Sequence, residues 1–327
     1  MKILVTGGAG FIGSHACKAL KEAGHQPVVL DNLRTGHLWA VKYGPFEHGD
    51  ILDTERVANV IKNYEIDAVM HFAALAYVGE SITRPGTYYR TNVVGTLSLL
   101  DAMRLTGVDR IIFSSTCATF GNINHPISEV DEQKPINPYG ASKLMIERVL
   151  KDYATAYGIG SVALRYFNAA GSDPDGQLGE VHEPETHLMP LALFAAAGMR
   201  DKLSVFGTDY DTPDGTCIRD YIHVCDLADA HVSALNVLEP SKFQAYNLGN
   251  GSGFSIKQVI DRVEAVVGRS VPWEPAARRP GDPPSLVANA AAAYARLGWY
   301  PKYTSLDDMI EHAWNFLTER RSRLSSQ

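Results

Sequence analysis

The pattern with the clearest chemistry is a tyrosine followed four residues later by a lysine, in Pro138-Tyr139-Gly140-Ala141-Ser142-Lys143. Pro138 suits the first turn of a helix, where its missing N–H is not needed, so Tyr139 and Lys143 would share one helix face. A phenol has an unperturbed pKa of about 10, and a neighbouring ammonium lowers it. The pair therefore predicts a proton-transfer site, although a tyrosine ring packed on a lysine stem at a solvated helix face has the same spacing.

The amino-terminal 31 residues have the order that dinucleotide binding requires. Residues 2–6 form a short apolar run typical of a buried parallel strand, and a second strand, 27–30, ends at Asp31. Between them lies a glycine-rich turn that opens a helix, with Gly7, Gly10, Phe11, Ile12 and Gly13. Glycines allow a pyrophosphate to approach the helix N-terminus, and a carboxylate accepts from ribose hydroxyls. Asp31 would repel a 2′-phosphate, which favours NAD, although Arg34 leaves NADP open.

Strand and helix signals alternate as far as residue 168. The remaining expected strands are 46–49, 68–72, 110–115 and 161–166, and the expected helices run through Leu20 to Gly24 and over 54–64, 88–105 and 138–157. This alternation predicts an α/β fold of the Rossmann type, with a doubly wound parallel sheet. Ligands of such sheets bind beyond the carboxyl ends of the strands. We therefore expect one cleft, lined with Tyr139 and Lys143 by Asp50, Phe72, Ala73, Ser114, Ser115, Thr116, Tyr166, Phe167 and Asn168.

The pattern becomes less regular after Asn168. The expected elements are a loop at 169–187, helices at 188–198, 227–238 and 255–267, a strand at 203–206, a proline-rich loop at 278–284, a helix from Ser305 and a polar tail at 323–327. The sequence thus predicts a dinucleotide-binding domain at 1–168 and a smaller mixed α/β substrate domain at 169–327, some of whose segments return to the first.

Composition excludes several functional classes. The 327 residues carry 30 Lys and Arg against 37 Asp and Glu, a net charge of −7, which disfavours binding to nucleic acid or an anionic membrane. No apolar run approaches the roughly 20 residues that span a bilayer. The four cysteines suit a reduced, cytoplasmic protein. The histidines, among them His182, His187, His223 and His231, show no metal-ligand spacing, so no metal is expected.

Taken together, the motifs resemble those of the extended short-chain dehydrogenase/reductases and, within them, the UDP-sugar 4-epimerases. They are the Thr6–Gly13 loop, Ser114-Ser115-Thr116, Tyr139 with Lys143, Arg165-Tyr166-Phe167-Asn168, Gly207-Thr208-Asp209-Tyr210, Asp214-Gly215-Thr216, Arg219–Val224 and Arg278-Arg279-Pro280-Gly281-Asp282. The resemblance implies interconversion of UDP-glucose and UDP-galactose through a transient 4-keto sugar, with NAD as bound cofactor. Other stretches resemble epimerases of exopolysaccharide synthesis and UDP-xylose 4-epimerases, so UDP-xylose and UDP-arabinose remain alternative substrates.

The resemblance also implies a role for each matching residue. Tyr139 would exchange the proton of the sugar 4-hydroxyl, Thr116 would hydrogen-bond that hydroxyl, and Lys143 would bind the nicotinamide ribose and lower the Tyr139 pKa. The cofactor residues implied are the five of the glycine turn with Asp31, Asn32, Asp50, Ile51, Phe72, Ala73, Asn92, Tyr139, Lys143 and Tyr166. The substrate residues implied are Thr116, Tyr139, Phe167, Asn168, His187, Leu188, Arg219, Arg279, Asp282 and Leu286.

Several alternatives stay open at this point. Thr116 could be only a strand-end hydroxyl, Arg219 could pair with Asp220, and Arg278 and Arg279 could both be solvated. The sequence also departs from the enteric-type epimerases, with Ala76 in place of a lysine near the cofactor, His187 in place of an asparagine, and Leu286 in place of a tyrosine beside the sugar.

The same fold could also serve a nucleotide-sugar dehydratase or a non-catalytic NAD-binding regulator. A nucleotide-sugar dehydratase needs an acid and a base directly after the threonine, where this chain has Cys117 and Ala118. A non-catalytic NAD-binding regulator predicts a damaged threonine–tyrosine–lysine set, which is intact here.

Apolar residues also recur at helical spacing around Val93, Val94, Leu97 and Leu100 and around Met145 and Val149. Related epimerases pair such helices between subunits, so a homodimer is expected; the alternative is that these stripes face only their own sheet.

Overall fold

A computed structural model of the chain describes residues 1–279 and 282–325. Its centre is a seven-stranded sheet in the order β10-β6-β5-β4-β1-β2-β3, and every neighbouring pair is parallel. The strands are β1 Lys2–Thr6, β2 Gln26–Asp31, β3 Phe46–His48, β4 Ala68–His71, β5 Arg110–Thr116, β6 Gly160–Tyr166 and β10 Phe243–Leu248. The Rossmann-type doubly wound sheet is confirmed.

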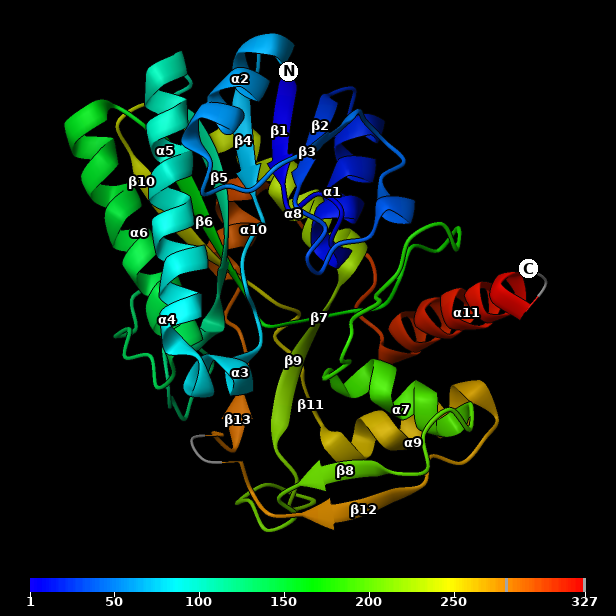
Figure 1. Ribbon diagram of the computed structural model, residues 1–327. Helices are drawn as coiled ribbons and strands as arrows, with labels where there is room; N and C mark the ends of the chain where they lie inside the picture. The colour runs from blue at the N-terminus through cyan, green and yellow to red at the C-terminus, as the bar shows by residue number, and fades with distance from the viewer. Residues whose placement is uncertain (280–281, 326–327) are drawn as a thin grey trace.

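Helices cover both faces of this sheet (Figure 1). Alternate residues of β1 enter two different cores, Leu4 on one face and Ile3 and Val5 on the other, as expected for a strand buried on both sides. The first face packs against α2 Thr54–Tyr64, α5 Gly95–Thr106 and α6 Pro138–Tyr157, and the second against α1 Phe11–Glu22, α8 Val224–Ala234 and α10 Ala291–Leu297.

The remaining elements lie mainly beyond the carboxyl ends of the large sheet (Figure 1). A four-stranded sheet contains β7 Asn168–Ala170, β9 Ile218–His223, β11 Gly253–Ser255 and β13 Ser285–Leu286, and a parallel pair joins β8 Leu203–Phe206 to β12 Trp273–Ala276. The helices α7 Leu188–Ala196, α9 Ile256–Val267 and α11 Leu306–Ser325 share a third core. Short elements are η1 Leu38–Ala40, α3 Val78–Thr83, α4 Pro85–Tyr88, η3 Cys117–Thr119 and η4 Leu235–Val237.

Local structure differs from the sequence expectations in four places. The helix expected at 88–105 is α4, a π-helical turn η2 (Tyr89–Val94) and α5. The helix expected from Leu227 begins at Val224, because the His223 ring accepts from the Cys225 N–H (3.1 Å) and caps it. The loop expected from 169 still belongs to β7 as far as Ala170, and the tail expected at 323–327 is helical to Ser325, with 326–327 outside the described residues.

The strand β10 was not anticipated, although it completes the large sheet from a distant part of the chain. Its pairing with β6 places residues 243–248 beside residues 161–166 in parallel register. In the described part of the chain, no helix has the length and apolar character needed to cross a membrane.

Candidate active site

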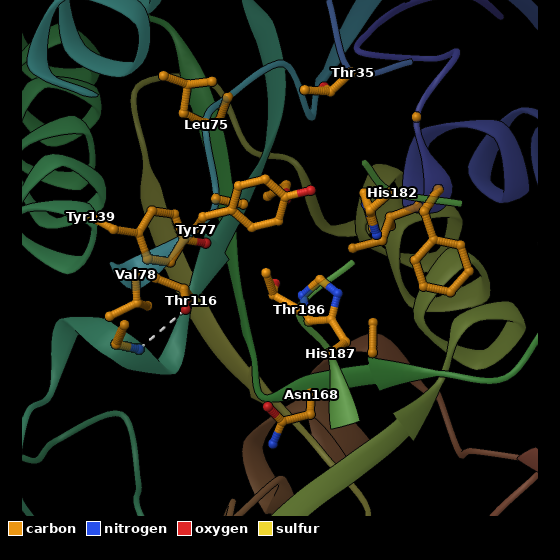
Figure 2. A pocket seen from close by; sticks show the side chains of 18 of the residues that line it. Thr35, Leu75, Tyr77, Val78, Thr116, Tyr139, Asn168, His182, Thr186 and His187 are labelled. Atoms are coloured by element: carbon orange, nitrogen blue, oxygen red, sulfur yellow. Dashed lines mark hydrogen bonds between the residues drawn. The ribbon is translucent and has the colours of Figure 1, made fainter. Parts of the chain in front are cut away.

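A cleft of about 1250 Å³ opens at the carboxyl ends of the large sheet. It brings together every residue expected to contact cofactor or substrate except Asn92. Ser115, which was expected to line the cleft, does not, because its buried hydroxyl donates to Glu147 (2.6 Å) behind β5. Figure 2 shows Tyr139 and Thr116 on one side of this space, His182 and His187 on the other, and Asn168 at its end. The topology that makes the cleft is the one inferred from strand alternation, since β1, β4, β5 and β6 all end there.

The glycine turn packs too closely against its own backbone and the loop after β4 to admit side chains, as the tight turn of a dinucleotide site requires. A Cβ on Gly13 would lie 2.2 Å from the Gly7 carbonyl oxygen, and a Cβ on Gly7 (φ +74°) would lie 2.6 Å from the Ala73 nitrogen. The N-cap of α1 is Gly10, which provides no side-chain cap, so N–H groups of the first turn are left for an anion. These residues therefore match the needs of a pyrophosphate held close to the backbone.

Asp31 lies at the end of β2 beside this turn. Its carboxylate accepts from the Ala9 N–H (3.0 Å) and the Leu33 N–H (2.8 Å), which fix its orientation in the cleft. A carboxylate has about four acceptor sites, so two remain for ribose hydroxyls. Asn32 donates to Asp50 (2.8 Å), which joins two more of the expected cofactor residues at neighbouring strand ends.

Asn92 is the one expected cofactor residue that the structure does not place in the lining of the cleft. Its side chain is fully buried in η2, where its oxygen accepts from the Leu75 N–H (2.9 Å) and its nitrogen donates to the Leu75 carbonyl (3.1 Å) and the Ser142 hydroxyl (3.0 Å). Both amide donors are thus used within the protein, and Asn92 does not line the cleft. Its observed contacts hold the loop after β4 against α6.

Two elements, β5 and α6, position the threonine, tyrosine and lysine. Thr116 ends β5, while Tyr139 and Lys143 come from the first turns of α6, which Asn137 caps by accepting from the Gly140 N–H (2.8 Å). All three side chains are more than nine-tenths buried. The Lys143 ammonium donates to the Ser114 carbonyl (2.7 Å) and lies 6.0 Å from the centre of the Tyr139 ring.

The expected lowering of the Tyr139 pKa is not what the protein groups produce. Burial raises the pKa of Tyr139 above its ordinary value, and a hydrogen bond with Thr116 opposes that rise only in part. Burial also lowers the pKa of Lys143 to about 7, which weakens its charge at neutral pH. The protein groups by themselves therefore do not produce the lowered pKa inferred from the spacing, because the cost of desolvation dominates at both residues.

The far end of the cleft carries the arginines. Arg219 lies 3.5 Å from Asp282 and donates to the Ile218 carbonyl (2.8 Å), while Asp220 accepts from three backbone N–H groups. The alternative pairing of Arg219 with Asp220 is therefore wrong. Two arginines near one diphosphate can neutralise it with bidentate hydrogen bonds.

The two adjacent arginines have different environments. Arg279 stacks on the Phe206 ring at 4.0 Å and lines the cleft, whereas Arg278 pairs with Asp209 (2.7 Å) away from the cleft lining. Leu286 pairs in parallel register with Arg219, which places the residue expected beside the sugar next to the arginine expected at the phosphates. Pro280 and Gly281 of the same motif lie outside the described residues.

Sequence reasoning missed a polar cluster in the cleft wall. The chain from Glu180 to His187 folds so that Glu180, His182, Glu185 and His187 converge, with the four ligand-type atoms within 4.8 Å of one another. Although burial opposes charged rings, the two carboxylates raise the pKa of His182 to about 9 and of His187 to about 10. The spacing of two, three and two residues gave no signal because the segment is irregular, so neither the helical nor the strand period applies.

Comparisons with known proteins agree on the family. A model of the NAD dependent epimerase/dehydratase family matches residues 3–249. The UDP-glucose 4-epimerase of Halalkalibacterium halodurans is 50% identical to the chain, over 100% of the chain and 98% of its own length. That of Rhizobium meliloti is 52% identical, over 97% of the chain and 97% of its own length. The crystal structure of a Brucella ovis UDP-glucose 4-epimerase with NAD is 54% identical over 96% of the chain and 97% of its own, with a TM-score of 0.92. A structure from Stenotrophomonas maltophila, with NAD and formylated UDP-arabinopyranose, is 40% identical over 99% of both chains, with a TM-score of 0.95.

Proposed function

Because the chain belongs to the NAD dependent epimerase/dehydratase family, we propose that it inverts the configuration at C4 of a UDP-hexose and so interconverts UDP-glucose and UDP-galactose. The observation that carries this proposal is the placement of Thr116, Tyr139 and Lys143 in one cleft with a glycine turn at one end and Arg219 at the other. That cleft provides a proton-transfer group between a dinucleotide site and a diphosphate site.

The proton chemistry is assigned to Tyr139. As the phenolate it takes the proton of the sugar 4-hydroxyl, and the hydroxyl so formed later returns that proton to the oxygen of the 4-keto sugar, so Tyr139 acts first as general base and then as general acid. NAD, which the glycine turn and Asp31 would hold, would supply the redox chemistry at C4, as acceptor and then donor of one hydride. Thr116, whose hydroxyl already accepts from the Ala118 N–H (3.1 Å), keeps its own proton to donate to the substrate oxygen.

The diphosphate is held while the sugar turns between the two hydride transfers. Arg219, Arg279 and Asp282 line the same cleft as Tyr139, and we assign them to the UDP moiety, which they would anchor without fixing the hexose. The cleft walls also include Phe167 and Leu286, whose apolar surfaces make few directional contacts with a rotating ring. Asn168, whose amide donates to the Asp220 carbonyl (3.0 Å), keeps its oxygen for the substrate.

A UDP-pentose is the second candidate substrate. The ligand of the Stenotrophomonas protein is a UDP-arabinopyranose derivative, and a UDP-pentose differs from a UDP-hexose by the substituent at C5. A nucleotide-sugar dehydratase is disfavoured by the residues after Thr116. Burial raises the pKa of the Cys117 thiol to about 12, and Ala118 has no ionisable group, so neither supplies the acid or base that dehydration requires.

We also propose that the enzyme is a cytoplasmic homodimer. Val94 on η2 and Met145 on α6 are 45% and 47% exposed, and Leu105 on α5 is 69% exposed, which leaves apolar surface on these neighbouring elements. Leu100, by contrast, is fully buried in the sheet core and does not contribute to that surface. The four free cysteines suit a reducing compartment.

The test is to incubate the purified protein with UDP-galactose and to measure UDP-glucose, with UDP-xylose and UDP-arabinose in parallel. We expect reversible conversion of UDP-galactose without net consumption of NAD. Conversion of UDP-xylose alone would replace the proposed substrate by the second candidate, and a 4-keto-6-deoxy product would point to a dehydratase.

A further inference from the structure

The cluster in the cleft wall has the geometry of a metal site. The Nδ1 atoms of His182 and His187 lie 3.1 Å and 2.7 Å from the same Glu180 oxygen. The His182 Nδ1 also lies 3.5 Å from the Glu185 Oε2, and the His187 Nδ1 lies 3.0 Å from the Glu185 Oε1. Ligand atoms around a tetrahedral ion with bonds of about 2.0–2.1 Å are about 3.3 Å apart, so these separations surround the expected value.

Hydrogen bonds within the protein leave two atoms of this cluster without a partner. The His182 Nδ1 and the Glu185 Oε2 are both buried, yet neither has a hydrogen bond of acceptable geometry. The Glu185 side chain is only 5% exposed. The backbone N–H groups of Thr186 and His187 donate only to its other oxygen, Oε1. An unpartnered carboxylate oxygen at such depth is costly unless something positive occupies the space that it faces.

We propose that Glu180, His182, Glu185 and His187 bind a divalent transition-metal ion, with zinc as the first choice. Two imidazole nitrogens and two carboxylate oxygens form a mixed donor set that zinc accepts with four ligands, whereas magnesium and calcium prefer oxygen donors and more of them. An ion there would give the unpartnered atoms of His182 and Glu185 a common partner.

The position of this site in the cleft explains what the ion would do. Glu180, His182 and His187 line the cleft, and the His187 side chain is 45% exposed. Figure 2 shows the His182 and His187 side chains on the wall across from Tyr139 and Thr116. The Tyr77 ring contacts both imidazoles, with centroids 6.0 Å and 6.4 Å away. The ion would therefore fix the irregular segment 180–187 as a rigid wall, a role that does not depend on which sugar the enzyme converts.

Metal binding is tested on tag-free protein treated with a chelator and then titrated with zinc chloride against a chromogenic zinc indicator. We expect one ion per chain. Glu180→Gln and His182→Ala should each weaken binding by more than about 10–100-fold, the loss typical of removing only a supporting contact to a ligand. Glu183→Gln is the matched control, because Glu183 is an exposed carboxylate of the same segment outside the cluster, and it should leave affinity unchanged.

Cobalt substitution provides a second readout. The cobalt-loaded protein should show the intense visible absorption of four-coordinate cobalt, and His182→Ala should lose it. Far-ultraviolet circular dichroism and melting curves separate loss of the site from loss of the fold, and the isosteric Glu180→Gln keeps the test available if His182→Ala does not fold. The proposal is overturned by the absence of stoichiometric binding, or by equal weakening in Glu180→Gln and Glu183→Gln. In either case the four side chains form only an ion-pair cluster and bind no metal ion.

Discussion

Removing the Tyr139 hydroxyl is the most direct perturbation of the proposed proton transfer. In Tyr139→Phe the ring stays, and with it the packing against Leu75, Tyr88 and Ala118. Thr116 keeps the hydrogen bond that it accepts from the Ala118 N–H and loses only the one with the Tyr139 hydroxyl. We therefore expect a change in the free energy of unfolding of at most about 1 kcal/mol, the net value of one hydrogen bond.

The effect on turnover should be much larger. General acid–base catalysis contributes about 10²–10⁴-fold, which corresponds to about 3–5 kcal/mol of transition-state stabilisation. The variant leaves the glycine turn and Asp31 unchanged, so cofactor content should remain at the wild-type level. The expected signature is therefore a selective loss of kcat in a folded enzyme that carries nucleotide.

The assay follows conversion of UDP-galactose by wild type, Tyr139→Phe and the control Tyr77→Phe, together with melting temperature and bound nucleotide. Tyr77 is a matched control because its ring also lines the cleft, but its contacts are with His182 and His187. Tyr77→Phe should retain turnover within a few-fold. Turnover by Tyr139→Phe within tenfold of wild type would refute the assignment, as would an equal loss in Tyr77→Phe.

Four further predictions follow from the same structure. Nucleotide released from denatured protein should include NAD(H), and Gly13→Ala should lower the amount of bound NAD(H), because the new Cβ would lie 2.2 Å from a backbone oxygen of the glycine turn. An unchanged amount would contradict the assignment of the glycine turn to the cofactor. Leu286, expected beside the sugar, should by its size slow conversion of UDP-N-acetylglucosamine relative to UDP-glucose, so Leu286→Tyr should lower the ratio of the two kcat/KM values and Leu286→Ser should raise it, each by about 10–200-fold; an unchanged ratio would exclude this role for Leu286. In nucleotide-stripped protein, burial lowers the pKa of Lys143 to about 7, below its unfolded value, so above pH 7 the unfolded chain binds more protons than the folded one. The free energy of unfolding should therefore rise from pH 7 to 8.5 more steeply in wild type than in Lys143→Met, and an equal rise of melting temperature with pH in both proteins would contradict this. Sedimentation at micromolar concentration should show a dimer that Met145→Glu weakens, and a wild-type monomer would argue against the proposed assembly.

The sequence predicted those parts of the fold and site that local patterns encode. The glycine turn, the strand ending at Asp31 and the helix carrying Tyr139 and Lys143 are each defined within a few residues, and parallel topology then brings strand ends together. The capping box of Ser255 and Gln258 is another local signal, and both of its hydrogen bonds form. The division into domains at residue 168 and the roles of the site residues stay predictions.

Features that depend on distant contacts were not predictable in this way. β10 is a strand because residues 243–248 pair with β6 about eighty residues earlier, and the short run Phe243–Leu248 has no strong period of its own. Asn92 was assigned to the cofactor by motif position, but the contacts with Leu75 and Ser142 that use its amide come from other segments. Glu180 and Glu185 likewise acquire their meaning only when the irregular segment folds back on itself.

The Tyr139–Lys143 pair shows why spacing alone does not determine the pKa of a buried group. The Lys143 ammonium lies 6.0 Å from the centre of the Tyr139 ring, and at a separation of about that size and an effective dielectric constant of about 20, its full charge would stabilise a phenolate by on the order of 3 kcal/mol, or about two pKa units. The same burial that strengthens this attraction removes both groups from water, lowering the pKa of Lys143 to about 7 and raising that of Tyr139. Each group therefore ionises more readily when the other is already charged, and the two titrate as a coupled pair. Activation of Tyr139 thus requires conditions that keep Lys143 protonated, and the contact of Lys143 with the Ser114 carbonyl is the first of these, because a carbonyl accepts better from an ammonium than from a neutral amine.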